Sequence, residues 1–356
     1  MLVDITKVLL PAIIAFVIGV VMTPFWTGFL YRHELWKKKA KTVAVDGGGT
    51  PIFNSLHKEK EVGTPRLGGV IIWCASAITI IFIYLFARAT PFIFFDKLDF
   101  LSRDQTWIPL LTLILGAIVG LFDDVMEIRG NGGHTAGGMS LRKRLTIIGF
   151  ISLLCALWFY IKLDVVGIGF FGGSIIYLGW LFVPFFVLVT MALYSGGVID
   201  GLDGLAGGIF ATMFTAYAAI AFYQSQFNLA AFCATIVGAT LAFLWFNIPP
   251  ARFYMSETGS MALTITLAVV AFMTDSLGEG HGIIVLPVIA LPLVITTASV
   301  IIQILSKKFR GKKVFLVAPL HHHFEALGWP AYKVTMRYWI VGVVSAVFGV
   351  ILALIR

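Results

Sequence analysis

Residues 107–124 read WIPLLTLILGAIVGLFDD, an almost continuously apolar run that ends on two adjacent aspartates. A run of this length and hydrophobicity is typical of a helix that crosses a lipid bilayer. Similar runs recur along the chain, and because backbone groups find no water in lipid, each must be helical. We predict ten spans, at 8–31, 67–88, 107–122, 145–161, 174–193, 205–222, 229–246, 260–274, 283–305 and 338–355.

The composition agrees with a membrane protein, since 59% of the residues are hydrophobic and only 12% are charged. Residues 1–356 are therefore expected to form a single, all-α polytopic membrane domain. The ninth span contains Pro287 and Pro292 and should bend, because proline removes a backbone donor and clashes with the preceding helical turn.

Lysine and arginine are distributed unevenly between the two faces. Of the 26 such residues, 20 lie in the loops 32–66, 123–144, 247–259 and 306–337. The positive-inside rule places these loops in the cytoplasm and both termini outside. A run such as KKKAK at 37–41 is explained by orientation and by attraction to anionic lipid alone. With no soluble basic domain, nucleic acid is not expected as a partner.

Most of the unusual polar chemistry lies in five stretches, each separated from the next by an even number of spans. All five therefore share the cytoplasmic face, which predicts an active site built there from five loops. They are GTPRLGG (63–69), LFDDVMEIRG (121–130), GGVIDGLDGLAGG (196–208), FYMSETGS (253–260) and APLHHHFEALGWP (318–330).

Asp123 and Asp124 directly follow a hydrophobic span. Two carboxylates at this depth are costly unless they are paired or bound to a cation. Mg²⁺ suits them, because it takes oxygen ligands and shares them with phosphates. One acid could bind the metal while the other accepts a proton. The alternative is a solvated pair that merely ends the helix.

Asp200 and Asp203 lie among glycines and share one face if their turn is helical. The glycines permit close approach to a ligand, although a glycine seam is also common where membrane helices pack. Glu257 precedes the eighth span, where Thr258 could cap the helix and the helix N-terminus attracts anions. The acid itself could equally serve only as a cap.

His321, His322 and His323 are consecutive. Consecutive helical residues point about 100° apart, which suits zinc poorly. Pro319 favours a non-helical entry, and in an extended or turn segment alternate histidines could face one site. We interpret the triplet as a phosphate- or sugar-recognition element that handles protons, rather than as a metal site.

Basic and aromatic side chains complete the candidate site. Lys58, Lys60, Arg142 and Arg144 could hold a diphosphate, although each alone could be an orientation charge. Tyr254 could stack on a base or belong to an interfacial aromatic belt. Acids for Mg²⁺, cations for phosphate and a site at the lipid boundary together indicate phosphoryl transfer with a lipid substrate.

These motifs resemble those of the polyprenyl-phosphate N-acetylhexosamine-1-phosphate transferase superfamily, and within it the phospho-N-acetylmuramoyl-pentapeptide transferases. The resemblance runs from about residue 60 to the C-terminus, and the histidine-bearing stretch separates this family from its relatives. The matching elements are GTPRLGG, GLFDD, GMSLRKRL (138–145), DGLDGLAGG (200–208), FLWFN (243–247), SVIIQ (299–303) and APLHHHFEALGWPAYKVTMRYWI (318–340).

The resemblance implies transfer of phospho-MurNAc-pentapeptide from UDP-MurNAc-pentapeptide to undecaprenyl phosphate, giving lipid I and UMP with Mg²⁺. It also implies a multi-pass protein of the bacterial cytoplasmic membrane, with its site facing the cytoplasm, and a homodimer.

The resemblance also implies roles for the site residues. By it, one member of the pair Asp123 and Asp124 is a base or nucleophile, Asp200 lies near the nucleotide, and His321–His323 lie near the sugar phosphate. Glu257, with Asp124, falls at the magnesium position, and Tyr254 falls where an aromatic stacks on uracil. Further substrate contacts fall at Lys58, Lys60, Arg66, Arg142, Arg144, Asp203, Asn247 and Gln303.

The chain departs from the family pattern at several positions near these residues. Glu257 keeps the metal-binding charge on a longer arm, and Arg66 could supply the positive charge that Glu127 removes. The departures are Glu127 for lysine, Tyr194 and Gly197 for asparagine, Ser256-Glu257 for Gly-Asp, Arg66 for threonine and Thr296 for glutamate.

Two other classes remain open. A related transferase would make polyprenyl-diphosphate N-acetylglucosamine, and the histidine triplet argues against it. A lipid or ion transporter would hold its acids near mid-span, whereas here the acids lie at the cytoplasmic ends of the spans.

Overall fold

The computed structural model describes residues 2–37, 62–90, 93–101, 106–130, 138–170, 174–276 and 281–355. Within these ranges ten helices are long and apolar enough to cross a membrane, which confirms the predicted ten-span helical fold. They are α1 (Leu2–Arg32), α3 (Gly69–Ala89), α5 (Trp107–Arg129), α6 (Leu141–Lys162), α7 (Phe182–Ser195, which reaches Gly179–Ile199 with its flanking 3₁₀ turns), α8 (Leu205–Tyr223), α9 (Phe227–Asn247), α10 (Ser256–Ser276), α12 (Leu291–Arg310) and α14 (Ala331–Leu354).

The smaller elements correct the start of the predicted fifth span. Residues 174–177 form the strand β2 (Ser174–Tyr177), which pairs antiparallel with β1 (Gly167–Phe170), and the helical span begins after this strand. Helix α7 follows, extended by the 3₁₀ turns η2 (Gly179–Leu181) and η3 (Gly196–Ile199). The remaining short helices are α4 (Ile93–Leu98), α11 (Leu286–Ile289) and α13 (Leu320–Ala326).

Burial divides the helices into a centre and a periphery. In the apolar part of α10, 94% of the residues are buried, and in those of α8 and α9 the share is 78%. In α1 and α14 only 28% of these residues are buried. The outer helices expose large apolar side chains, Phe25 and Ile340 among them, as expected of surfaces that face lipid. The helix at the centre, α10, packs most extensively on α5.

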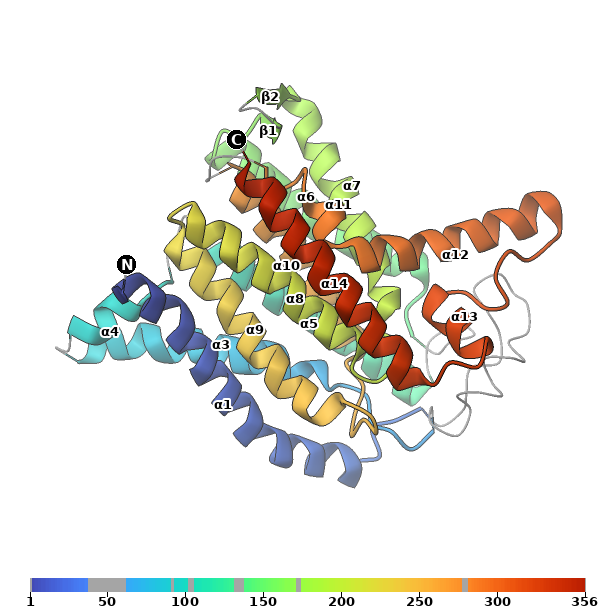
Figure 1. The fold of residues 1–356 in the computed structure, drawn as a ribbon. Helices are drawn as coiled ribbons and strands as arrows, with labels where there is room; N and C mark the ends of the chain where they lie inside the picture. The colour runs from blue at the N-terminus through green and yellow to red at the C-terminus, as the bar shows by residue number, and fades with distance from the viewer. Residues whose placement is uncertain are drawn as a thin grey trace.

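The ninth span is broken, as its prolines predict. It consists of α11 and α12, which meet at Ala290, and each helix has a proline in its first turn. Figure 1 shows α12 leaving the bundle and projecting away from the other helices. Both chain ends and the hairpin lie at one end of the bundle, and α13 lies at the other (Figure 1).

Candidate active site

The end of α5 and the start of α10 meet because glycines on α5 let the two backbones touch. A Cβ atom at Gly120 would overlap the Glu257 carbonyl group, and one at Gly116 would lie 2.9 Å from the Ala262 Cα. No other residue fits at Gly120 without moving a helix. This close approach places Asp123 and Asp124 beside Glu257.

Two acids from distant segments cap the N-terminus of α10. The fully buried Asp124 accepts hydrogen bonds from the Thr258 hydroxyl group (2.6 Å), the Thr258 N–H (2.9 Å) and the Glu257 N–H (3.3 Å). Asp200 accepts one from the Ser256 N–H at 2.8 Å. A helix N-terminus leaves such N–H groups unpaired and favours negative charge. These carboxylates therefore hold the helix in place as well as lining the site.

Burial raises the pKa of Asp200 to about 6, against the opposing effect of the Ser256 N–H. Asp200 and Asp203 do not share a helical face, because they lie in the turns between η3 and α8. Asp203 instead accepts a hydrogen bond from the Ala251 N–H at 3.3 Å.

A first arginine joins two of the acids. Arg144, near the start of α6, lies 2.7 Å from the Asp123 carboxylate and also pairs with the Glu257 carboxylate. The Met139 N–H donates to the second Asp123 oxygen at 2.6 Å. Tyr194 contacts the same guanidinium from the end of α7. Arg144 thus bridges the two carboxylates, one from the end of α5 and one from the start of α10.

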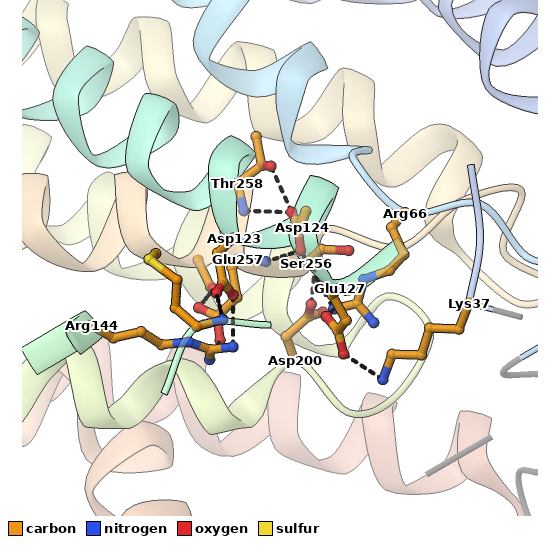
Figure 2. Close-up of polar contacts among 12 residues, drawn as sticks. Lys37, Arg66, Asp123, Asp124, Glu127, Arg144, Asp200, Ser256, Glu257 and Thr258 are labelled. Carbon is orange, nitrogen blue, oxygen red and sulfur yellow. Dashed lines mark hydrogen bonds and ion pairs between the residues drawn. The ribbon is translucent and has the colours of Figure 1, made fainter. Parts of the chain in front are cut away.

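A second arginine, Arg66, pairs with the other aspartate, Asp124. Arg66 lies 3.5 Å from the Asp124 carboxylate and 2.8 Å from that of Glu127, which also pairs with Lys37 at 2.7 Å. Figure 2 shows the two arginines on opposite sides of the aspartate pair. Burial lowers the pKa of the Arg66 guanidinium, but the surrounding carboxylates, Glu127 first, outweigh it and hold that pKa above its ordinary value.

The three histidines lie in the helix α13, so they do not form the extended or turn segment that Pro319 was expected to favour. Proline is well tolerated just before a helix. His321 and His322 are buried, and a Cβ atom at Gly201 would meet the Nε2 atoms of both rings. These two side chains therefore lie beside the turn that carries Asp200. His323 points elsewhere, accepting a hydrogen bond from the Leu316 N–H at 3.2 Å.

All five polar stretches thus meet, through Arg66, Asp123 and Asp124, Asp200, Glu257, and His321 and His322. Sequence reasoning missed one long-range pair, Lys37 with Glu127, and one local pair, His322 with Glu325. Lys37 belongs to a run assigned to membrane orientation, and nothing local in the sequence indicates its pairing with Glu127. Glu325 lies 2.7 Å from the His322 Nδ1 atom, and its spacing of three residues from that histidine on a helix was the available signal.

Two predicted substrate contacts, Asn247 and Gln303, form hydrogen bonds with the backbone. The Asn247 amide group accepts from the Gly204 N–H (2.9 Å) and donates to the Phe253 carbonyl oxygen (2.7 Å). The Gln303 side chain bonds the backbone of Val314 and Phe315 through both of its polar atoms. Both residues brace loops near the site.

The other predicted contacts differ in position. Tyr254 is half-buried beside Arg66, because its backbone pairs with Pro65 and Gly68. The Arg142 side chain is exposed, and no contact brings it to the carboxylates within the described ranges. Lys58 and Lys60 lie outside the residues that the structure describes.

The donor atoms suit magnesium. Five carboxylates face three cationic side chains, so one divalent cation would neutralise the excess negative charge. No group of three or more His, Cys, Asp or Glu side chains among the described residues is arranged to hold a metal. Mg²⁺ commonly uses one or two carboxylates and completes its shell with substrate phosphates. The carboxylates are Asp123, Asp124, Glu127, Asp200 and Glu257, and the cations are Lys37, Arg66 and Arg144.

Comparison with known proteins agrees with this geometry. Residues 106–275 match Glycosyl transferase family 4. A phospho-N-acetylmuramoyl-pentapeptide-transferase from Chloroflexus aurantiacus is 33% identical over 99% of this chain and 91% of its own length. Proteins of the same name from Levilactobacillus brevis and Halalkalibacterium halodurans are 34% and 31% identical, each over 97% of this chain and over 98% and 97% of their own lengths. The chain therefore belongs to the phospho-N-acetylmuramoyl-pentapeptide transferases of glycosyl transferase family 4.

Proposed function

We propose that the chain transfers phospho-MurNAc-pentapeptide from UDP-MurNAc-pentapeptide to undecaprenyl phosphate, releasing UMP and forming lipid I. The observation that carries the proposal is the convergence of five carboxylates and three cations where α5, α10 and the Asp200 turn meet. Phosphoryl transfer needs little covalent chemistry from a protein, and positioning with charge neutralisation suffices.

In the proposed reaction an oxygen of the lipid phosphate attacks the sugar-linked phosphorus of the nucleotide. A new P–O bond joins lipid and sugar phosphates, and the bond from that phosphorus to the bridging oxygen of UMP breaks. UMP leaves with the electron pair. If the lipid phosphate is still protonated, its proton passes to Asp123, which is fully buried and held by Arg144 and the Met139 N–H.

The cationic side chains take up the charge that develops on the leaving nucleotide. Arg144 and Arg66 flank the aspartate pair, so each is placed to neutralise phosphate oxygens as they gain charge. Mg²⁺ would be held by Glu257, whose side chain is 22% exposed, with Asp124 behind it, and it would supply further neutralisation of the diphosphate. His321 and His322, beside Gly201, are placed to contact the sugar phosphate.

The test is UMP release by purified protein in detergent with both substrates and Mg²⁺. Release should require the lipid and should stop when the metal is chelated. Asp123→Asn should lower it strongly, whereas Asp96→Asn, at a distant helix, should leave it unchanged. Release from UDP-GlcNAc but not from UDP-MurNAc-pentapeptide would reassign the donor sugar. Lipid or ion transport without UMP release would exclude a transferase.

The remaining expectations extend this proposal. The named relatives are consistent with placement in the bacterial cytoplasmic membrane. A site that faces the cytoplasm stays a prediction from the positive-inside rule. A homodimer, implied by the resemblance, stays a prediction and would be measured by mass in detergent.

A further inference from the structure

One buried acid at the edge of the site holds two cations from different parts of the chain. Glu127 lies 2.7 Å from the Lys37 Nζ atom and 2.8 Å from an Arg66 guanidinium nitrogen. All three side chains are largely enclosed, with exposures of 13% for Lys37, 16% for Arg66 and 7% for Glu127. Enclosed charges are costly in such a setting, and charged groups in settings of this kind cluster at functional sites.

The backbone holds the two cations in place. The Arg66 N–H donates to the Leu35 carbonyl oxygen at 2.9 Å, which ties the Arg66 loop to the segment that follows α1. The Tyr254 N–H donates to the Pro65 carbonyl oxygen at 2.9 Å, and the Gly68 N–H donates to Tyr254 at 2.8 Å. Lys37 and Arg66 are thus fixed relative to the segment that leads into Glu257.

Two carboxylates hold Arg66, Glu127 at 2.8 Å and Asp124 at 3.5 Å, and Asp124 also accepts hydrogen bonds from the first turn of α10. The Arg66 Nε atom is buried and has no hydrogen-bond partner among the parts of the chain that the structure describes. A fixed guanidinium with a donor to spare is suited to an oxyanion.

We propose that Lys37 and Arg66 form a phosphate-binding pair and that Glu127 is the positioning residue that holds both cations toward the phosphate. This inference rests on the proposed function and deepens it, because it assigns a phosphate contact to Lys37 and a role to Glu127. The ligand is a phosphate oxyanion, carried either by the nucleotide diphosphate or by the polyprenyl phosphate. Loss of Glu127 would leave both cations without a fixed direction.

The experiment measures kcat and the KM of each substrate for Lys37→Met, Glu127→Gln and Glu127→Asp. The matched control is Lys308→Met, which removes an exposed lysine of the same charge from α12. We expect Glu127→Gln and Lys37→Met to raise the KM of one substrate by about tenfold, as loss of one charge-assisted contact would. We expect kcat to stay within about threefold, and Glu127→Asp to recover part of the affinity.

The substrate whose KM rises identifies the source of the phosphate. Unchanged KM values for both substrates would overturn the inference. So would an equal rise in both KM values with a lowered unfolding temperature, because that result indicates a structural role alone.

A second measurement separates this inference from the proposed function. If wild-type protein releases no UMP, the proposed function fails, but thermal stabilisation by UDP and by undecaprenyl phosphate can still be measured. Smaller stabilisation of Glu127→Gln than of wild type by either compound would support the phosphate-binding pair. If each compound stabilised Glu127→Gln as much as it stabilises wild type, the phosphate-binding pair would be refuted.

Discussion

Replacing Thr258 by valine should weaken the junction between α5 and α10. The Thr258 hydroxyl group donates to the Asp124 carboxylate at 2.6 Å, and both side chains are fully buried. Valine keeps the shape but removes the donor. A hydrogen bond to a charged group contributes about 1.5–3 kcal/mol. At the usual unfolding entropy per residue, that loss lowers the unfolding temperature of a 356-residue chain by about 2–4 °C.

The assay is thermal unfolding in detergent, followed by the fraction of protein that remains monodisperse. Thr258→Ser, which keeps the hydroxyl group, should unfold near wild type. Thr264→Val is the matched control: its hydroxyl group bonds backbone carbonyls of the same helix, so its loss should cost less than 1 kcal/mol or so. If Thr258→Val were no less stable than Thr264→Val, the hydroxyl–carboxylate bond would contribute nothing and the reasoning would be refuted.

Two further predictions concern pH and packing. Burial raises the pKa of Asp200 to about 6, so the folded state favours the protonated carboxyl group. The stability that Asp200 contributes is therefore fully present below its ordinary pKa and is lost as pH rises through about 6. The unfolding temperature of wild type should therefore fall relative to that of Asp200→Asn between about pH 4 and 6, and a constant difference would contradict the raised pKa. Gly120→Ala should destabilise by about 1–3 kcal/mol and lower UMP release, because its methyl group overlaps the Glu257 carbonyl group. Gly28→Ala, where the added carbon meets nothing, should unfold at or above the wild-type temperature, and similar behaviour of the two variants would contradict the close approach.

The spans could be predicted because backbone groups find no water in lipid, so every apolar segment that crosses the bilayer must be a helix. The error at residues 174–177 shows the limit of that rule. Ile175, Ile176 and Tyr177 are as apolar as the start of a helix, and only pairing with β1 makes them a strand. The sequence predicts the start of the eighth span at residue 260, four residues after the start of α10, for a similar reason. Asp124 and Asp200, far away in the sequence, cap that helix at residue 256.

The acids of the site could be predicted because carboxylates beside hydrocarbon need an explanation. Their partners could not, because ion pairs between distant loops leave no local pattern. Lys37 was indistinguishable from the lysines that follow it, and it pairs with Glu127 through the fold. The expectation that Arg66 offsets Glu127 was more specific, and the structure places their charged atoms 2.8 Å apart.

The unequal burial of the spans predicts where the sequence tolerates change over evolutionary time. A relative that is 33% identical differs at roughly two positions in three. Such differences should accumulate along α1 and α14, where one lipid-facing apolar side chain replaces another without leaving a cavity. They should be rare along α10, which is 94% buried and meets neighbouring backbone directly. The central helix should therefore diverge about as slowly as the acids at its end, although most of its side chains contact only other helices.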